Sequence, residues 1–451
     1  MPHSNSASVI TIDLRAPARR ALVILPALLA ILSAWFIVRW YVGDTVAEYA
    51  PENPASATEL ARLATRWAPH DAFAHWTLGA LEEKEFSANN LAEAVHEYEI
   101  AVTLSPNDYR YWMELGRGLE ASGNSAGGER ALGHAVDLAP AYSQPRWYFG
   151  NLLLREGKLD EAFQQFARAT DADPQLRGQV FNLAWQVFGG NVDEIAKVAC
   201  PSATARTQFA IYLVGLNRPD DALRIWATNS PADRLAQSAL GADLEKALIE
   251  AKHLHAALEV ERDIEVERGA LPAPETFRNG GFEFEIKLPS NRNFDWVIRS
   301  VPQVQIAIDT RAHNGHGSLR IIFAAPNKLD AIHVGQGIAV EPNTQYRVEC
   351  FARTENLNSG STPVVMIIDN ADGTALASSP PLPTGTNDWQ RIALEFKTKP
   401  KSDGVIVKLA RESCSETKVC PIFGTVWYDD FNLQRSNGPA GSRGTTVRGR
   451  R

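Results

Sequence analysis

Two pairs of histidines are the residues best suited to metal or acid–base chemistry. His253 and His255 lie in a helical segment, where the i, i+2 spacing directs the two rings away from each other. His313 and His316 flank a glycine-containing turn. A metal site at that turn needs further ligands, and the sequence identifies none.

Other catalytic signatures are missing from the sequence. Gly335-Gln336-Gly337 lacks the third glycine and the following helix of a dinucleotide site. There is no GxSxG, HExxH or P-loop motif. No two carboxylates stand out as a glycosidase pair. We therefore predict that the protein is not an enzyme.

The four cysteines bear on the compartment rather than on catalysis. No CxxC pair occurs, which argues against a zinc ribbon or a thioredoxin-like site. Cys414 and Cys420 are six residues apart with a mostly polar stretch between them, as at the tip of a hairpin. In an oxidising compartment they would form a disulfide that contributes about 2 kcal/mol. The alternative is two free thiols.

The composition suits a globular chain of more than one domain. The chain has 451 residues, of which 45% are apolar. Its net charge of −8 argues against a nucleic-acid partner, because phosphate binding needs a basic surface. The arginines near the C-terminus lie in a Gly/Ser/Thr/Pro-rich stretch, so we predict a disordered tail over residues 437–451.

An uncharged run of 18 residues, Ala21 to Val38, predicts a transmembrane anchor over residues 21–42. Trp40 and Tyr41 follow it as an interfacial belt would. Arginines precede the run and acidic residues follow it. The positive-inside rule then puts residues 1–20 in the cytoplasm and the later domains in the periplasm of a bacterial inner membrane.

A cleaved signal peptide is the alternative interpretation of the same run. Its hydrophobic region would be long for a signal peptide. The nearest small-residue site, Ala47-Glu48-Tyr49-Ala50, is followed by Pro51, which is a poor context for cleavage. We therefore favour the uncleaved anchor, followed by a linker over residues 43–56.

A repeat occupies the next part of the chain. Alanine–proline pairs five residues apart recur at intervals of 37, 34 and 34 residues: Ala64/Pro69, Ala101/Pro106, Ala135/Pro140 and Ala169/Pro174. A glycine after an apolar residue precedes three of the pairs: Gly79, Gly116 and Gly150. A 34-residue unit of two helices is typical of tetratricopeptide repeats (TPRs).

The unit from Tyr109 to Tyr142 resembles the TPR family, with matching residues at Trp112, Leu115, Gly116, Gly123, Gly128, Leu132, Ala135 and Pro140. Residues 57–267 are thus predicted to form a TPR-like solenoid. It would begin with the second helix of a half repeat, Ala57 to Pro69, and end in a closing helix, Asp243 to Glu267. The resemblance implies a groove for a protein partner, lined by Trp76, Arg110, Met113, Arg117, Glu120, Trp147, Asn151 and Arg155. The alternative for Trp76 and Trp147 is packing against the neighbouring helix.

Beyond a linker at residues 268–276 the periodicity changes from helical to alternating. Leu319, Ile321 and Phe323 sit at alternate positions, and similar runs follow between turn signals such as Asp403-Gly404. Many short strands at this spacing predict an antiparallel β-sandwich over residues 277–436. The fold class is therefore α + β multidomain, with an anchor, a helical solenoid and a sandwich.

The order of motifs in this segment resembles the galactose-binding-like jelly roll of many carbohydrate-binding modules. It opens with Asn279-Gly280-Gly281-Phe282-Glu283 and closes with Val426-Trp427-Tyr428-Asp429-Asp430-Phe431. The resemblance implies a candidate structural calcium, with Glu283, Asp429 and Asp430 as ligands. The alternative is solvated or salt-bridged carboxylates.

The same resemblance implies aromatic platforms for a sugar, and Trp296 and Phe351 are the candidates. Alternation places Trp427 on the same face as Phe431 and Leu433, which predicts that Trp427 belongs to the core. The leading hypothesis is a non-catalytic scaffold for exopolysaccharide or envelope assembly, whose groove binds a protein and whose sandwich contacts a polysaccharide. The alternative is a carbohydrate-recognition protein in which the TPR array is a spacer.

Overall fold

The computed structural model describes residues 17–52, 56–84, 88–265, 273–284, 286, 294–299, 304–324, 333–412 and 420–436. The tail predicted at 437–451 and most of the first segment lie outside these ranges. The chain forms two compact units, residues 1–190 and 191–451.

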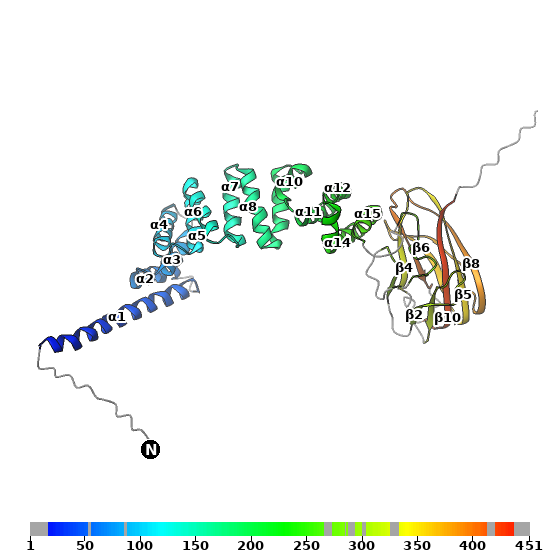
Figure 1. Ribbon diagram of the computed structural model, residues 1–451, viewed down its shortest axis with the longest axis horizontal. Helices are drawn as coiled ribbons and strands as arrows, with labels where there is room; N and C mark the ends of the chain where they lie inside the picture. The colour runs from blue at the N-terminus through cyan, green and yellow to red at the C-terminus, as the bar shows by residue number, and fades with distance from the viewer. Residues whose placement is uncertain are drawn as a thin grey trace, which may run out of the picture. The chain divides into compact units, whose positions relative to one another are not determined.

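Unit 1 is a series of helices joined by short turns (Figure 1). They are α1 (Pro17–Tyr49), α2 (Ala57–Trp67), α3 (Ala72–Lys84), α4 (Ala88–Leu104), α5 (Tyr109–Ala121), α6 (Ser125–Leu138), α7 (Ser143–Arg155), α8 (Leu159–Ala172) and α9 (Arg177–Val187), with 3-10 turns at Ala50–Glu52 and Pro174–Leu176. The pairs α3/α4, α5/α6 and α7/α8 are the three predicted repeat units. The small residues allow the close contacts expected of them. A Cβ on Gly150 of α7 would lie 2.7 Å from the ring of Phe166 in α8.

Helix α1 does not end with the apolar run. It continues to Tyr49, and Ala47 packs with Ala64 of α2 and Ala74 of α3 in a buried cluster. Residues 43–49, which the sequence assigned to a linker, are helical. The C-terminal part of α1 therefore supplies the first helix that the half repeat at α2 lacked.

Unit 2 begins with six more helices: α10 (Val192–Ala199), α11 (Ala203–Gly215), α12 (Pro219–Ala227), α13 (Pro231–Ala236), α14 (Ser238–Glu250) and α15 (Leu254–Ile264). The single closing helix predicted from Asp243 to Glu267 is wrong. The chain breaks at Lys252, whose φ of 72° is incompatible with a continuing right-handed helix. Helix α15 then starts a new direction at Leu254.

The rest of unit 2 is two antiparallel five-stranded sheets, which confirms the predicted sandwich. One has the order β1-β4-β9-β6-β7 and the other β2-β3-β10-β5-β8. The strands are β1 (Val297–Arg299), β2 (Val304–Asp309), β3 (Ser318–Phe323), β4 (His333–Ala339), β5 (Gln345–Ser359), β6 (Val364–Asp369), β7 (Ala375–Ser378), β8 (Gly385–Lys397), β9 (Gly404–Ala410) and β10 (Ile422–Arg435).

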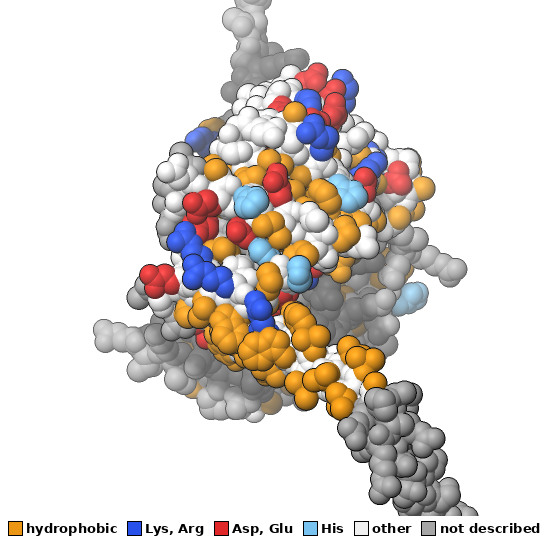
Figure 2. All heavy atoms as spheres, turned by 90° about the vertical axis from the view of Figure 1, so that its left-hand side faces the viewer, with side chains coloured by type: hydrophobic (Ala, Val, Ile, Leu, Met, Phe, Trp, Pro, Cys, Tyr) orange, Lys and Arg blue, Asp and Glu red, His pale blue; other side chains and the backbone are white. Residues whose placement is uncertain are grey.

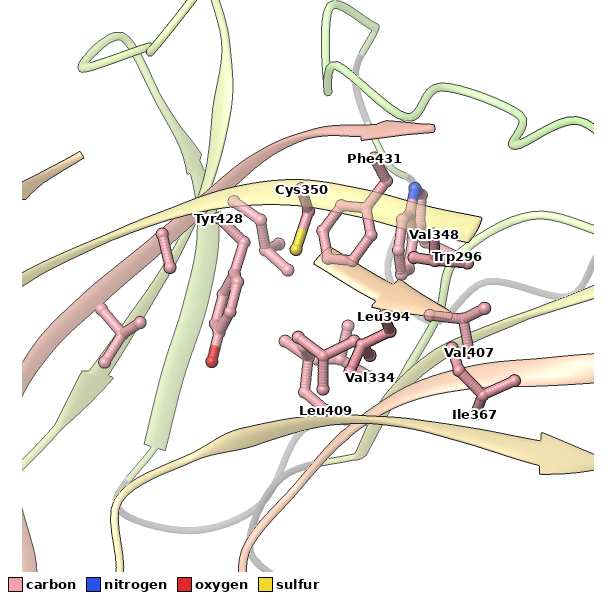
Figure 3. Packing of buried hydrophobic residues seen from close by; sticks show 14 of the residues in the cluster. Trp296, Val334, Val348, Cys350, Ile367, Leu394, Val407, Leu409, Tyr428 and Phe431 are labelled. Carbon is pink, nitrogen blue, oxygen red and sulfur yellow. The ribbon is translucent and has the colours of Figure 1, made fainter. Parts of the chain in front are cut away.

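The sandwich core lies between the two sheets, and both contribute alternate side chains to it. Val348 and Cys350 of β5 and Tyr428 of β10 meet Val407 and Leu409 of β9 (Figure 3). All five side chains are buried. The alternation read from the sequence is therefore the alternation of this core.

Strand β10 contains a bulge that the sequence did not reveal. Its register against β5 shifts between Asp429 and Asn432, and Asp430 has a φ of 53°. An extra residue reverses which side chains face the core. Trp427 is buried as predicted, with 3% exposed, but it lies on the opposite side of the sheet from the core residues Val426 and Tyr428. The prediction that it shares a face with Phe431 is wrong.

Candidate binding surfaces

The first helices of consecutive repeats carry a row of charged and aromatic side chains. It is made by Glu83 of α3, Glu114, Arg117 and Glu120 of α5, and Tyr148 and Arg155 of α7. We call this surface the first-helix face. Helix α5 contacts both α3 and α7, so the row is continuous across three repeats.

Arg117 is the centre of the first-helix face. Its guanidinium pairs with Glu114, lies 3.7 Å from Glu83 and covers the ring of Tyr148 with its Cζ 4.9 Å from the ring centroid. Tyr98 of α4 donates its hydroxyl to Glu83 across 2.9 Å. Burial raises the pKa of the Glu114 carboxyl, and the charge of Glu83 adds to that rise while Arg117 opposes it. Two carboxylates thus share one guanidinium.

A second ion pair continues the first-helix face. Arg155 donates from Nη2 to Glu120 Oε2 across 2.7 Å, which joins α7 to α5. The Arg155 side chain remains 59% exposed. This pair is accessible to a partner, and it is neutral as a unit.

Three of the eight predicted groove residues, Arg117, Glu120 and Arg155, therefore lie together. Met113 does not, because it is buried with Leu132 and Leu152 between repeats. Arg110 pairs with Asp108, the N-cap of its own helix. The Asn151 amide donates to the carbonyl of Trp147 within α7.

The two groove tryptophans follow the packing alternative. Trp76 is half-buried, with its ring 6.2 Å from that of Tyr111. Trp147 is half-buried, with its ring 5.1 Å from that of Phe166. Glu83, Glu114 and Tyr148 were missed, although Glu114 lies three residues before Arg117 on the same helical face.

In unit 2, the turn between β2 and β3 folds over the outer side of the second sheet. His313 stacks on Phe351 of β5 with ring centroids 3.7 Å apart, and its edge approaches Trp389 of β8 at 5.7 Å. Arg311 covers Trp427, whose Nε1 donates to Asp309 across 2.9 Å. Phe351, a candidate sugar platform, thus has one ring face covered by His313, whereas Trp389 is half-exposed.

Trp296, the other candidate platform, is in the core. It is 1% exposed and its ring packs 4.9 Å from Phe431 and 5.1 Å from Phe282 (Figure 3). Its Nε1 donates to the carbonyl of Asn279. No ring face is left for a sugar, because Phe277, Phe282 and Phe431 pack around the indole.

The three calcium candidates hold this same turn, two of them by accepting backbone N–H groups and the third by pairing with a histidine ring. Asp429 accepts from His313 N at 2.8 Å and Asn314 N at 3.2 Å, and Glu283 accepts from His316 N at 2.9 Å. Asp430 pairs with His313 Nδ1 at 2.7 Å. Burial raises the pKa of the Asp429 carboxyl, against the lowering effect of these backbone donors.

In the structure each of these three carboxylates has a hydrogen-bond or ion-pair partner within the protein. Within the ranges that the structure describes, no three His, Cys, Asp or Glu groups are arranged to hold a metal ion. The structure favours the alternative of carboxylates with protein partners.

The remaining reactive residues have structural surroundings. His255 Nδ1 lies 2.7 Å from Asp403 Oδ1, which joins α15 to the sandwich. Cys200 and Cys350 are buried thiols that take no part in a disulfide. Cys420 is disulfide-bonded, and Cys414, its predicted partner, lies outside the described residues.

One helix in the described ranges, Ile24–Glu52, is long and apolar enough to cross a membrane, with a mean hydropathy of 1.7. A signal sequence would have the same properties.

No family model matches the sequence. The chain is 30% identical over 94 residues to DnaJ homolog subfamily C member 3 of Bos taurus and of Homo sapiens. That match covers 21% of this chain and only about a fifth (19%) of the length of these curated relatives.

Solved structures similar to this chain come from both classes that the sequence resembles. One is MamA, with 14% sequence identity, a match over 41% of this chain and 91% of that chain, and a TM-score of 0.28. Another is YrrB, described as a TPR protein with an unusual peptide-binding site, with 21% identity, a match over 36% of this chain and 88% of that chain, and a TM-score of 0.28. A third is described as a CBM4 structure, with 16% identity, a match over 36% of this chain and 99% of that chain, and a TM-score of 0.28. At these TM-scores the similarities carry no argument about function. The predicted combination of TPR-like helix pairs and a β-sandwich is the fold observed in the chain itself.

Proposed function

We propose that this protein is a membrane-anchored scaffold whose TPR-like repeats bind a segment of another protein outside the cytoplasm. The run at Ala21 to Val38 is the anchor, with residues 1–20 in the cytoplasm and the later domains in the periplasm of a bacterial inner membrane. The domain limits are those derived from the sequence, except that residues 43–49 belong to α1 rather than to a linker. Envelope or exopolysaccharide assembly is the process that this organisation suits.

The observation that carries the proposal is the first-helix face. Partly exposed arginine and tyrosine side chains are the types that contribute most to protein interfaces. Arg117 holds Tyr148 and two carboxylates in a fixed arrangement, and fixed side chains lose little entropy when a partner binds. Arg155 and Glu120 extend the surface across two repeats.

A charge exchange tests the proposal without removing an ion pair. The double variant Glu120→Arg/Arg155→Glu keeps the salt bridge between α5 and α7 but reverses the charge pattern that a partner meets. A photo-crosslinking residue at Asn151, in the full chain in cell membranes, should capture a defined protein that the double variant no longer captures.

The matched control exchanges Lys158 and Glu129, an ion pair of 2.8 Å that involves the second helix α6. Glu129→Lys/Lys158→Glu should leave crosslinking unchanged. Equal capture by both double variants would contradict binding at the first-helix face.

Glycan binding by the sandwich is the second candidate. The observation in its favour is the group of partly exposed rings of Trp389, Phe351 and His313 on the outer side of a sheet, beside Asp430. Aromatic faces next to polar groups suit a sugar. In this view the repeats are a spacer.

A polysaccharide-binding assay on the full chain separates the two candidates. Trp389→Ala should lower retention on an immobilised polysaccharide. Phe423→Ala is the control, because Phe423 is an exposed aromatic residue of the same sandwich, 43% exposed, at the other end of β10. Retention that is the same in both variants would reject the site at Trp389.

A further inference from the structure

Helix α2 is tied to α1 at the point where the apolar run ends. Arg39 donates from Nε to the carbonyl of Trp67 across 2.9 Å and from Nη2 to the carbonyl of Arg66 across 2.7 Å. Ala68 packs so closely on α1 that a Cβ on Gly43 would lie 2.4 Å from its Cβ. The end of α2 is therefore fixed in height along α1.

The length of the apolar run determines where the end of α2 lies relative to a bilayer. Eighteen residues of helix rise about 27 Å, slightly less than the roughly 30 Å hydrocarbon core of a membrane. A bilayer centred on the run must then reach Arg39, and Trp40 and Tyr41 fall in the interfacial layer. The carbonyl of Trp67 bonds directly to the Arg39 side chain, so Trp67 lies in that layer too.

The surface of unit 1 at this level has the composition of an interfacial segment. Leu63 is 42% exposed and Trp67 39% exposed, one turn apart on α2. Pro69 and His70 follow in an exposed turn. Arg66 stands beside them. Figure 2 shows hydrophobic side chains along the projecting helix and around the place where it joins the repeats.

We propose that Leu63, Arg66, Trp67, Pro69 and His70 form a lipid-binding edge that seats the first repeat on the bilayer surface. The ligand is the headgroup layer of the membrane that α1 crosses. The tryptophan ring lies at the carbonyl level, and the Arg66 guanidinium binds lipid phosphate. Because α1 is continuous with the repeat through Tyr49, this contact orients the following helices relative to the membrane. The inference rests on the proposed anchoring by α1.

Depth-dependent quenching tests this edge in the full chain. Bimane is attached at Trp67→Cys or His70→Cys, and the protein is reconstituted into phosphatidylglycerol/phosphatidylethanolamine vesicles with lipids brominated near the headgroup. The control is Ala121→Cys, an exposed position at the end of α5. Helix α5 runs away from the turn that follows α4, and 13 residues span about 20 Å. Cys200 and Cys350 are buried thiols outside any disulfide, and the unsubstituted chain measures background labelling.

We expect quenching at positions 67 and 70 to be several-fold stronger than at 121. His70→Cys retains Trp67, so it reports on the edge even if Trp67→Cys unfolds. Equal quenching at 70 and 121, in a chain that floats with the vesicles, would overturn the lipid-binding edge and leave the anchor intact. A chain that does not float with vesicles would overturn the anchor itself.

Discussion

Arg39, at the end of the apolar part of α1, donates a hydrogen bond from Nε to the backbone carbonyl of Trp67, 28 residues later in the chain. Helix C-termini leave carbonyl oxygens without intrahelical partners, and here a side chain from the neighbouring helix satisfies them. The candidate membrane helix and the first repeat are thus one structural piece.

Removing the hydrogen bonds from Arg39 to the C-terminal carbonyls of α2 should destabilise this helix. Arg39→Ala leaves the carbonyls of Arg66 and Trp67 without the guanidinium, and we expect a loss of about 1 kcal/mol of stability in the first repeat. Hydrogen exchange of α2 in detergent micelles measures the effect, with Arg39→Lys as the milder control. Unchanged protection of α2 in Arg39→Ala would show that water replaces the cap at no cost.

The contact between α1 and α2 should not tolerate a larger residue at Gly43. An alanine there would place its Cβ 2.4 Å from the Cβ of Ala68, and overpacking of this kind costs about 1–3 kcal/mol. Gly133→Ala in α6 is the matched control, because its nearest neighbour would be 3.9 Å away. That substitution should be neutral or stabilise by up to about 1 kcal/mol. Thermal unfolding of both variants should separate them, and equal midpoints would contradict the close approach.

The junction of α15 with the sandwich should weaken as the pH rises. The Asp403 carboxylate raises the pKa of His255 above its ordinary value of 6.5, although burial lowers it. A raised folded-state pKa means that the stabilising charge is fully present below pH 6.5 and is lost as the pH rises through the folded-state pKa. Hydrogen exchange of α15, corrected for the intrinsic rate, should show less protection at high pH.

The variant His255→Gln removes the titrating group from this junction. We expect it to abolish most of the pH dependence of α15 protection. If the variant and the parent chain show the same profile, another group controls the junction.

The turn over the outer side of the sheet should depend on Asp429 rather than on calcium. Asp429→Asn replaces one of the two carboxylate oxygens by an NH2 group, so the side chain can no longer accept both from the turn and from Asp430 N, and we expect the sandwich to lose about 2 kcal/mol. Asp430→Asn is the control, because asparagine tolerates the φ of 53° at that position. Calcium should leave the melting temperature of the parent chain unchanged. A higher melting temperature on adding calcium would support the metal site that the sequence resemblance implied.

The identity of the elements could be predicted because local patterns specify them. The uncharged run from Ala21 to Val38, the 34-residue spacing of Pro106, Pro140 and Pro174, and the alternation around Ile321 each reflect the period of one element. These periods do not depend on distant contacts. The TPR-like pairs and the antiparallel sandwich follow from them.

The positions of the candidate site residues depended on contacts between distant parts of the chain. Trp296 and Met113 are buried by segments that pack over them, and His313 covers Phe351 from a turn 38 residues earlier. The bulge after Asp429 turned Trp427 outward, although strict alternation predicted the opposite. One extra residue reverses a period-two pattern, and no local signal marks where it occurs.

The sequence by itself determined that this protein combines a membrane-length apolar helix, helical repeats and a sandwich. Only the tertiary structure decided that α1 is also the first helix of the repeats, because that role rests on Arg39, Gly43 and Ala47 meeting α2. The length of a hydrophobic run can be counted from the sequence alone. Whether its last turns end in solvent or pack on another helix depends on shape complementarity, which exists only once both helices are folded together.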